Sequence, residues 1–124
     1  MKRAKAKRVD RSGSGGPGAD LPRQVGALLK AHGMTITTAE SCTGGGIAQA
    51  ITRVSGSSAW FDRGFVTYSN AAKEEMLGVS PETLEQHGAV SEATVREMAD
   101  GALQYSRAQV ALSVTWTAIG AVAR

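Results

Sequence analysis

The chain of 124 residues is long enough for one domain and too short for two, and its 42% hydrophobic content is typical of a folded globular protein. No stretch approaches the roughly 20 apolar residues that span a bilayer, no secretory signal follows the basic start, and the single cysteine cannot form an internal disulfide. The net charge is small, at +3, and these features together predict a cytoplasmic protein without a membrane anchor.

The positive charge is concentrated in a leader, residues 1–20. Residues 1–23 carry seven basic and two acidic side chains, whereas residues 24–124 carry seven basic and nine acidic ones. The leader is rich in glycine and has almost nothing apolar to bury, which predicts a disordered segment. Its cations could contact nucleic-acid phosphates, but no aromatic residues lie among them. We expect a solubilising or linker tail, with nucleic-acid contact as the weaker alternative.

The remaining chain alternates helical and extended patterns. Apolar residues at helical spacing, bounded by capping residues, proline or glycine, predict helices over residues 21–33, 44–54, 70–77, 80–88 and 91–103. Short β-branched or aromatic runs predict strands over residues 34–38, 61–68 and 110–115. Asn70 and Ser91 are the expected caps of the third and fifth helices. This alternation is typical of a layered α/β domain.

Residues 37–46 join the first strand to the second helix and contain Ser41, Cys42 and Thr43 followed by three glycines. Such a junction presents unpaired backbone N–H groups and the positive end of a helix dipole, which favour a phosphate or a developing oxyanion. Each of the three side chains offers a nucleophilic atom. The alternative is an ordinary helix cap with glycines that pack helix on strand. The segment matches neither a nucleotide P-loop nor a G-x-S-x-G elbow.

A serine nucleophile needs a base, and Lys73 is the better candidate for it. His32 and His87 both fall at expected helix ends, where a surface role is the simpler reading. With Asn70 as cap, Lys73 takes the third helical position, where a cation opposes the dipole. That placement suits a lysine that must be neutral to accept a proton, because burial and positive potential both lower its pKa. A solvated lysine without a role is the alternative.

Four motifs in order resemble one family: Thr38 to Gly45, Gly56 to Phe61, Gly64 to Asn70, and His87 to Glu92. Over about residues 21–115 the chain resembles the C-terminal domain of the competence-damage-inducible CinA proteins, a family that includes the nicotinamide-nucleotide amidases (PncC). The resemblance implies an α/β/α domain with a mixed sheet. It also implies hydrolysis of nicotinamide mononucleotide to nicotinate mononucleotide and ammonia, in pyridine-nucleotide salvage.

The resemblance also assigns residues. It implies Ser41 as nucleophile and Lys73 as base, with Tyr68 beside the substrate and Thr115 as a further contributing hydroxyl. The substrate-binding turn would be made by Cys42, Thr43, Gly44 and Gly45. Cys42 would contribute mainly its backbone N–H. The resemblance implies no metal and no cofactor, and its members commonly associate, so a homo-oligomer is expected as an option.

Residues 116–124 depart from the family pattern, which continues after Ser113-Val114-Thr115 with a glycine-rich loop, further strands and a late arginine. The sequence therefore predicts a partial amidase domain over residues 21–115, incomplete at its carboxyl end, and a non-homologous tail. Lost strands would leave an open sheet edge and an uncovered apolar face. The alternative to an active amidase is an inactive remnant, or a fragment that depends on a partner to fold.

Overall fold

The computed structural model describes residues 20–124, whose strands form one mixed sheet in the order β2-β1-β3-β4. The strands are β1 (Ile36–Glu40), β2 (Phe61–Val66), β3 (Val110–Val114) and β4 (Ile119–Ala123). The helices are α1 (Leu21–Ala31), α2 (Gly46–Thr52), α3 (Asn70–Leu77), α4 (Pro81–His87) and α5 (Glu92–Gln104), with a short 3-10 turn η1 (Ser57–Ala59). β1 pairs in parallel with β2 and β3, and β3 pairs antiparallel with β4.

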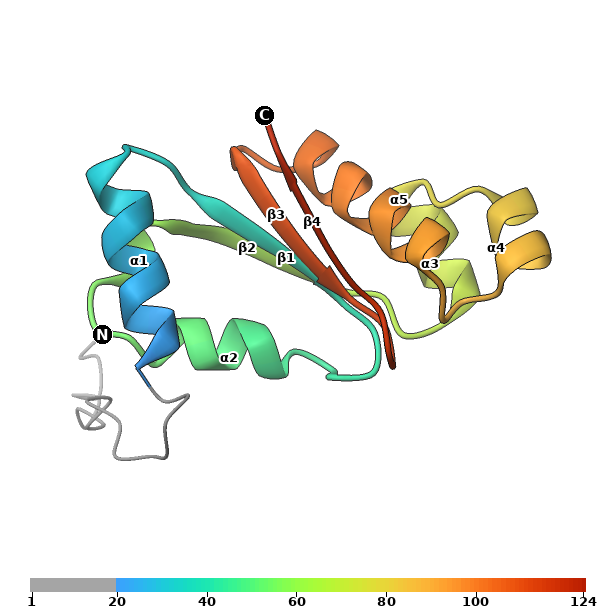
Figure 1. Cartoon of the computed structure of the whole chain (residues 1–124), viewed down its shortest axis with the longest axis horizontal. Coiled ribbons are helices and arrows are strands. Elements are labelled where there is room, and N and C mark those ends of the chain that lie inside the picture. The colour runs from blue at the N-terminus through green and yellow to red at the C-terminus, as the bar shows by residue number, and fades with distance from the viewer. Residues whose placement is uncertain (1–19) are drawn as a thin grey trace, which may run out of the picture.

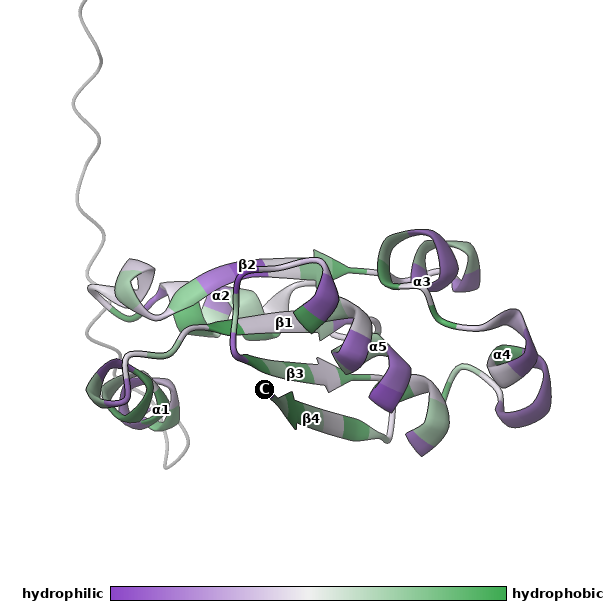
Figure 2. Ribbon diagram, turned by 90° about the horizontal axis from the view of Figure 1, so that it is seen from above, coloured by the Kyte–Doolittle hydropathy of each residue, from purple (hydrophilic) through white to green (hydrophobic). Residues whose placement is uncertain are grey.

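The sheet lies between two helical layers, which confirms the expected α/β/α architecture (Figure 1). On one face, Leu29 of α1 and Ile51 of α2 pack with Trp60 and Ile36. On the other face, α3 and α5 cover the sheet through a second cluster: Ala39, Leu77, Val79, Met98, Ala99, Ala102, Leu103 and Ala111. Figure 2 shows both hydrophobic and hydrophilic residues on α1 and α3; α1 buries Leu29 against the sheet, whereas α3 buries Leu77 together with the charged Lys73.

Side-chain caps mark the starts of α3 and α5, and a proline stands in the first turn of α1 and of α4. Pro22 stands in the first turn of α1, and the Ser91 hydroxyl accepts the Thr94 N–H at the start of α5, as the sequence predicts. Several boundaries were predicted wrongly: α2 covers residues 46–52 rather than 44–54, and β2 ends at residue 66 rather than 68. β1 covers residues 36–40 rather than 34–38. The cap of α3 is Ser69, whose hydroxyl accepts the Ala72 N–H, so the Asn70 cap is wrong and Asn70 is the first helical residue.

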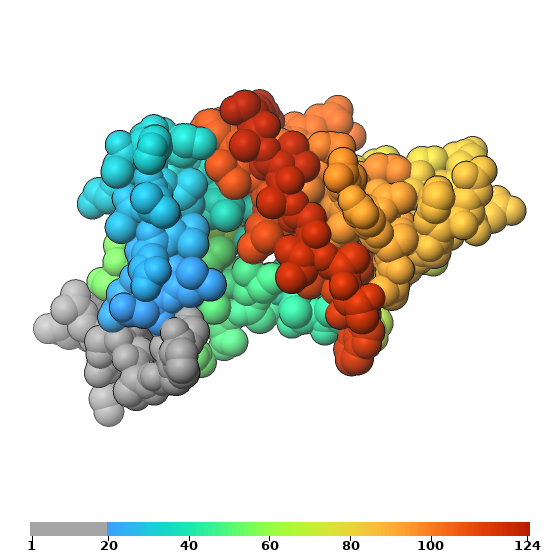
Figure 3. Space-filling model, viewed as in Figure 1, coloured from blue at the N-terminus to red at the C-terminus, as the bar shows by residue number. Residues whose placement is uncertain are grey.

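The tail, residues 116–124, contains β4, an element that the sequence analysis did not predict. β4 pairs along the whole of β3, from Val110 opposite Ala123 to Val114 opposite Ile119. Gly120 makes this approach feasible, because a Cβ there would lie 2.9 Å from the Ser113 hydroxyl and 3.1 Å from a carbonyl of α5. Figure 3 shows β4 running over the surface of the molecule, so β4 forms the outer strand on this side of the sheet. The predicted leader lies outside the described residues, apart from Asp20.

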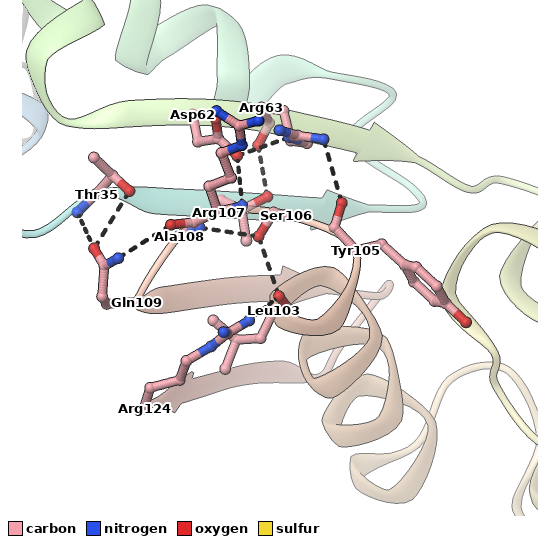
Figure 4. Close-up of polar contacts among 11 residues, drawn as sticks. Thr35, Asp62, Arg63, Leu103, Tyr105, Ser106, Arg107, Ala108, Gln109 and Arg124 are labelled. Atoms are coloured by element: carbon pink, nitrogen blue, oxygen red, sulfur yellow. Dashed lines mark hydrogen bonds and ion pairs between the residues drawn. The ribbon is translucent and has the colours of Figure 1, made fainter.

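Side-chain hydrogen bonds close the end of the sheet opposite the carboxyl ends of β1 and β3 (Figure 4). The Asp62 carboxylate accepts from Arg63 Nε at 2.7 Å and from the Arg107 N–H at 3.0 Å, which ties β2 to the α5–β3 loop. Gln109 accepts from the Thr35 N–H at 2.8 Å and donates to the Arg107 carbonyl. The Arg63 hydrogen bond holds the pKa of Asp62 below its usual value, against a raising effect of burial.

Replacing Asp62 with alanine should lower the free energy of unfolding at pH 7 by about 1–2 kcal/mol, because the Arg107 N–H loses its acceptor. The folded state lowers the pKa of Asp62, so its stabilisation is complete above the unfolded pKa and is lost as pH falls through the folded value. Urea unfolding of both proteins at pH 7 and pH 3 should show a difference that shrinks at pH 3. Asp100→Ala, at an exposed position on α5, is the control and should change little at either pH.

No helix within residues 20–124 combines the length and the apolar character needed to cross a bilayer.

Candidate active site

The predicted site residues gather at the carboxyl edge of the sheet, where the segments that follow β1, β2 and β3 meet (Figure 1). Ser41 comes directly after β1, Tyr68 lies between β2 and α3, and Thr115 comes directly after β3. Carboxyl ends of adjacent parallel strands lie at the same edge, so sequence order and topology bring these segments together. Ser41 is buried, with 9% of its surface exposed.

Ser41 and Lys73 share one hydrogen-bond acceptor, the backbone carbonyl oxygen of Tyr68. Ser41 Oγ donates to this oxygen at 3.5 Å and Lys73 Nζ donates to it at 2.9 Å. Ser41 directly follows β1 and Lys73 lies in α3, 32 positions further along the sequence, and both side chains point to a single atom. The structure therefore brings together the two residues that the sequence singled out as nucleophile and base.

Lys73 is almost fully enclosed, with 1% of its surface exposed. Burial lowers the pKa of its amine below the ordinary lysine value, and the electrostatic influence of the nearby Cys42 opposes this effect. No carboxylate within residues 20–124 forms an ion pair with it. The sequence argument placed Lys73 third in its helix, which is wrong, because capping by Ser69 makes it the fourth residue. Burial rather than the capping position is the main cause of the lowered pKa.

The turn after Ser41 is built on two glycines and one buried carboxylate. Gly44 and Gly45 have φ values of 57° and 104°, in the left-handed region that glycine favours. The Glu40 carboxylate accepts from the Thr43 hydroxyl at 2.5 Å and from the N–H groups of Ile47 and Ala48 at 2.8 and 2.9 Å. The Glu40 carboxylate therefore occupies the start of α2, and the remaining N–H groups of the turn are the ones left for the anion that the sequence favours at this junction. The sequence signal for this role of Glu40 is its position, as an acidic residue directly before the turn.

Some backbone N–H groups of the turn form no hydrogen bond with the rest of the described residues. The Ser41 N–H donates to the Val114 carbonyl and the Gly44 N–H donates to the Ser41 carbonyl. The N–H groups of Cys42, Thr43 and Gly45 donate to no acceptor within residues 20–124. These three residues follow Ser41 closely in the sequence. Their N–H groups are the donors available to an oxyanion at this edge of the sheet.

Thr67 and Thr115 flank Ser41 on the same face of the sheet. Ala39 of β1 lies between Phe65 of β2 and Ser113 of β3, and the residues two places further on are Ser41, Thr67 and Thr115. The ladder continues that far, since the Ser41 N–H donates to the Val114 carbonyl and the Thr67 N–H donates to the Glu40 carbonyl. Because strand side chains alternate between faces, the three hydroxyls lie in one row on the side of α3 and α5.

Both threonine hydroxyls are buried, and neither has a hydrogen-bond partner among residues 20–124. Buried hydroxyls without partners are uncommon, because desolvation then goes uncompensated. Thr115 was assigned from the family resemblance, whereas sequence reasoning missed Thr67. The signal that identifies Thr67 is its register beside the nucleophile, which needs the strand pairing to be seen.

The other predicted residues have clear positions. Tyr68 is 74% exposed, and its backbone carbonyl accepts from both Ser41 and Lys73. Cys42 is partly buried and is a free cysteine. The two histidines are exposed at the ends of α1 and α4. Within residues 20–124 no group of His, Cys, Asp and Glu side chains is arranged to hold a metal ion.

Curated proteins similar to this chain include nicotinamide-nucleotide amidohydrolases. The chain is 64% identical over 95 residues to the nicotinamide-nucleotide amidohydrolase PncC of Escherichia coli K12, and 66% identical over 96 residues to PncC of Enterobacter agglomerans. Each alignment covers 77% of this chain and 58% of the relative, so the chain spans less than two thirds of the length of these curated proteins.

Solved structures show the same fold. A competence-damaged protein (CinA) superfamily protein from Escherichia coli matches with a TM-score of 0.78 and 33% identity, over 89% of this chain and 67% of that one. A competence/damage inducible protein from Agrobacterium tumefaciens matches with a TM-score of 0.76 and 47% identity, over 90% and 64%. The family model described as the CinA C-terminal domain matches residues 18–121. The chain therefore belongs to the CinA C-terminal domain family.

Proposed function

We propose that this chain hydrolyses the carboxamide of nicotinamide mononucleotide to nicotinate mononucleotide and ammonia, with Ser41 as nucleophile and Lys73 as general base. The observation that carries the proposal is the convergence of Ser41 Oγ and Lys73 Nζ on the Tyr68 carbonyl oxygen. The names of the curated relatives, nicotinamide-nucleotide amidohydrolases, supply the substrate.

In the first half of the proposed reaction, Ser41 Oγ forms a bond to the carboxamide carbon while neutral Lys73 takes the hydroxyl proton. An amine is a proton acceptor only when it is uncharged, and burial of Lys73 favours that form. The carbonyl oxygen of the substrate then carries negative charge. The free N–H groups of Cys42, Thr43 and Gly45 are the donors that support the assignment of an oxyanion site to this turn.

In the second half, the tetrahedral adduct breaks its carbon–nitrogen bond, and the Lys73 ammonium returns its proton to the leaving nitrogen, which departs as ammonia. An ester between Ser41 and the nicotinoyl group remains. Water attacks this ester while Lys73 again accepts a proton. The bond from the carbonyl carbon to Ser41 Oγ then breaks, Lys73 returns the proton to Oγ, and the carboxylic acid is released. One base thus serves both half-reactions.

Tyr68 is strongly exposed and its backbone carbonyl lies between Ser41 and Lys73, which supports a place for this residue beside the substrate. The pyridinium ring of nicotinamide mononucleotide is a planar cation, which an aromatic face binds favourably. We assign Tyr68 to substrate binding rather than to proton transfer, because its backbone carbonyl and not its ring contacts Ser41 and Lys73.

The purified chain should release equimolar ammonia and nicotinate mononucleotide from nicotinamide mononucleotide, measured by enzymatic ammonia assay and chromatography of the product. The matched control is a preparation of the Ser41→Ala variant, which tests for contaminating amidases. Absence of product from the folded chain, with folding verified by circular dichroism and a cooperative melt, would reject the proposed activity. A melt without a cooperative transition would instead indicate the remnant or partner-dependent alternative.

A further inference from the structure

Three buried threonine hydroxyls lack a hydrogen-bond partner within residues 20–124: those of Thr38, Thr67 and Thr115. Thr38 lies on the α1 and α2 face of the sheet, where its hydroxyl lies so close to Gly64 that a Cβ on that residue would approach within 2.8 Å. Thr67 and Thr115 lie on the opposite face, beside Ser41. Two of the three uncompensated hydroxyls therefore belong to the site, and one lies outside it.

The proposed reaction changes the hydrogen-bonding needs of Lys73. The amine has one acceptor within residues 20–124, the Tyr68 carbonyl. Once Lys73 takes a proton it is an ammonium with three N–H donors, enclosed at 1% exposure. A buried charge needs compensation for most of its donors. Ser41 Oγ or the reacting nitrogen supplies a second acceptor, and one donor is left.

We propose, on the basis of the proposed function, that Thr67 Oγ1 is a positioning group that accepts a hydrogen bond from Lys73 Nζ after proton transfer. Thr67 directly precedes Tyr68, whose carbonyl already binds Lys73, and its side chain has 0% exposure. Its position two residues beyond Phe65 places the hydroxyl on the face that α3 covers. The Thr67 hydroxyl, which has no partner while Lys73 is neutral, thus becomes a hydrogen-bond acceptor when Lys73 is protonated.

The surroundings of Lys73 offer few other partners. Glu40 and Lys73 are the charged side chains buried within residues 20–124, and Glu40 is bound to the start of α2 on the other face. The side of α5 that covers the sheet carries apolar residues such as Val95 and Met98. Cys42 of the turn is the titratable group that acts electrostatically on Lys73.

The test replaces Thr67 with valine, which has the same shape and no hydroxyl. Loss of a hydrogen bond to a charged group should lower kcat/KM about 10- to 100-fold. The acidic limb of the pH–rate profile should move to lower pH, because an ammonium with fewer acceptors loses its proton more readily. Thermal stability should stay equal or rise, because the variant no longer buries an uncompensated hydroxyl. Thr67→Ser should retain most of the activity.

Thr38→Val is the matched control, since it removes an equally uncompensated hydroxyl outside the site. It should share the stability effect and keep the wild-type rate and pH profile. If Thr67→Val does not fold, Thr67→Ala provides the same comparison. A wild-type rate and pH profile in the folded Thr67 variant, or an equal loss in Thr38→Val, would overturn the proposal.

A readout without substrate separates this inference from the proposed function. Carbon-13 NMR of labelled lysine reports the pKa of Lys73 directly, with its signal assigned by its absence in Lys73→Met. Thr67→Val should lower that pKa and Thr38→Val should leave it unchanged. An unchanged pKa in Thr67→Val refutes the contact even if the enzyme is active. A lowered pKa in a chain that does not hydrolyse nicotinamide mononucleotide supports the contact and rejects the substrate.

Discussion

Replacing Ser41 with alanine should lower kcat/KM for nicotinamide mononucleotide by at least about 10³-fold, because Ser41 Oγ is the hydroxyl that shares the Tyr68 carbonyl with Lys73 and lies beside the free turn amides. Replacing Lys73 with methionine should cause a loss of similar size, since the two residues act as one unit, and the double variant should be little worse than either single variant. Initial rates of ammonia release provide the measurement.

Matched controls exist for both changes. Ser57 is a buried serine in η1, and Lys30 is an exposed lysine in α1. Ser57→Ala and Lys30→Met should retain activity within a small factor. Independent losses that multiply in the double variant would contradict the shared role of Ser41 and Lys73. Full activity in either single variant would remove that residue from the mechanism.

The buried amine also sets a pH dependence with a definite sign. Burial lowers the pKa of Lys73, and its neutral form is the proton acceptor, so kcat/KM should rise as pH increases through that lowered pKa. The same depression means that the unfolded chain binds the proton more tightly, so Lys73 disfavours the folded state at pH values below the ordinary lysine pKa. Lys73→Met should therefore unfold at the same urea concentration as wild type or a higher one at pH 7, even though it is inactive.

The parts of the fold that local chemistry determines could be predicted from the sequence. Helices α1, α4 and α5 begin at a proline or serine signal and have a strongly patterned apolar face or a closing glycine, and the structure places them where the sequence indicates. The choice of Ser41 and Lys73 as partners was also available from the sequence, because Ser41 stands in the glycine-rich motif and Lys73 follows the motif of residues 64–70 by three residues. Both side chains reach the Tyr68 carbonyl because Ser41 follows β1, Tyr68 follows the neighbouring parallel strand β2, and α3 begins two residues later.

Other features depend on contacts between distant segments and left no local signal. β4 is short and rich in alanine and glycine, so its strand character comes from pairing with β3 rather than from its own residues. Asn70 and Ser69 are both good caps, and the path of the chain from β2 decides for Ser69. The position of Thr67 beside Ser41 follows from the register of β2 on β1, which shifts between Ile36 and Thr37. A register shift is invisible in a single strand.

The Glu40 carboxylate ties the turn after Ser41 to the start of α2 by hydrogen bonds. Its replacement by glutamine should lower the free energy of unfolding by about 2–4 kcal/mol. Three donors converge on its carboxylate: the Thr43 hydroxyl and the N–H groups of Ile47 and Ala48. A glutamine side chain has the same length, but its amide nitrogen would face one of these donors with a further N–H. The favourable interaction of the carboxylate with the positive end of α2 would also be lost.

Urea unfolding at pH 7 measures this effect, with Glu85→Gln at an exposed position of α4 as the control, expected to change stability by less than about 0.5 kcal/mol. The Glu40 variant should also lose activity beyond its loss of stability, because the carboxylate holds the segment that carries Ser41 and the free amides. That loss should appear in kcat as well as KM at temperatures well below the melt. If Glu40→Gln is as stable and as active as wild type, the buried carboxylate does not position the turn, and the left-handed glycines alone must hold Ser41 against Lys73.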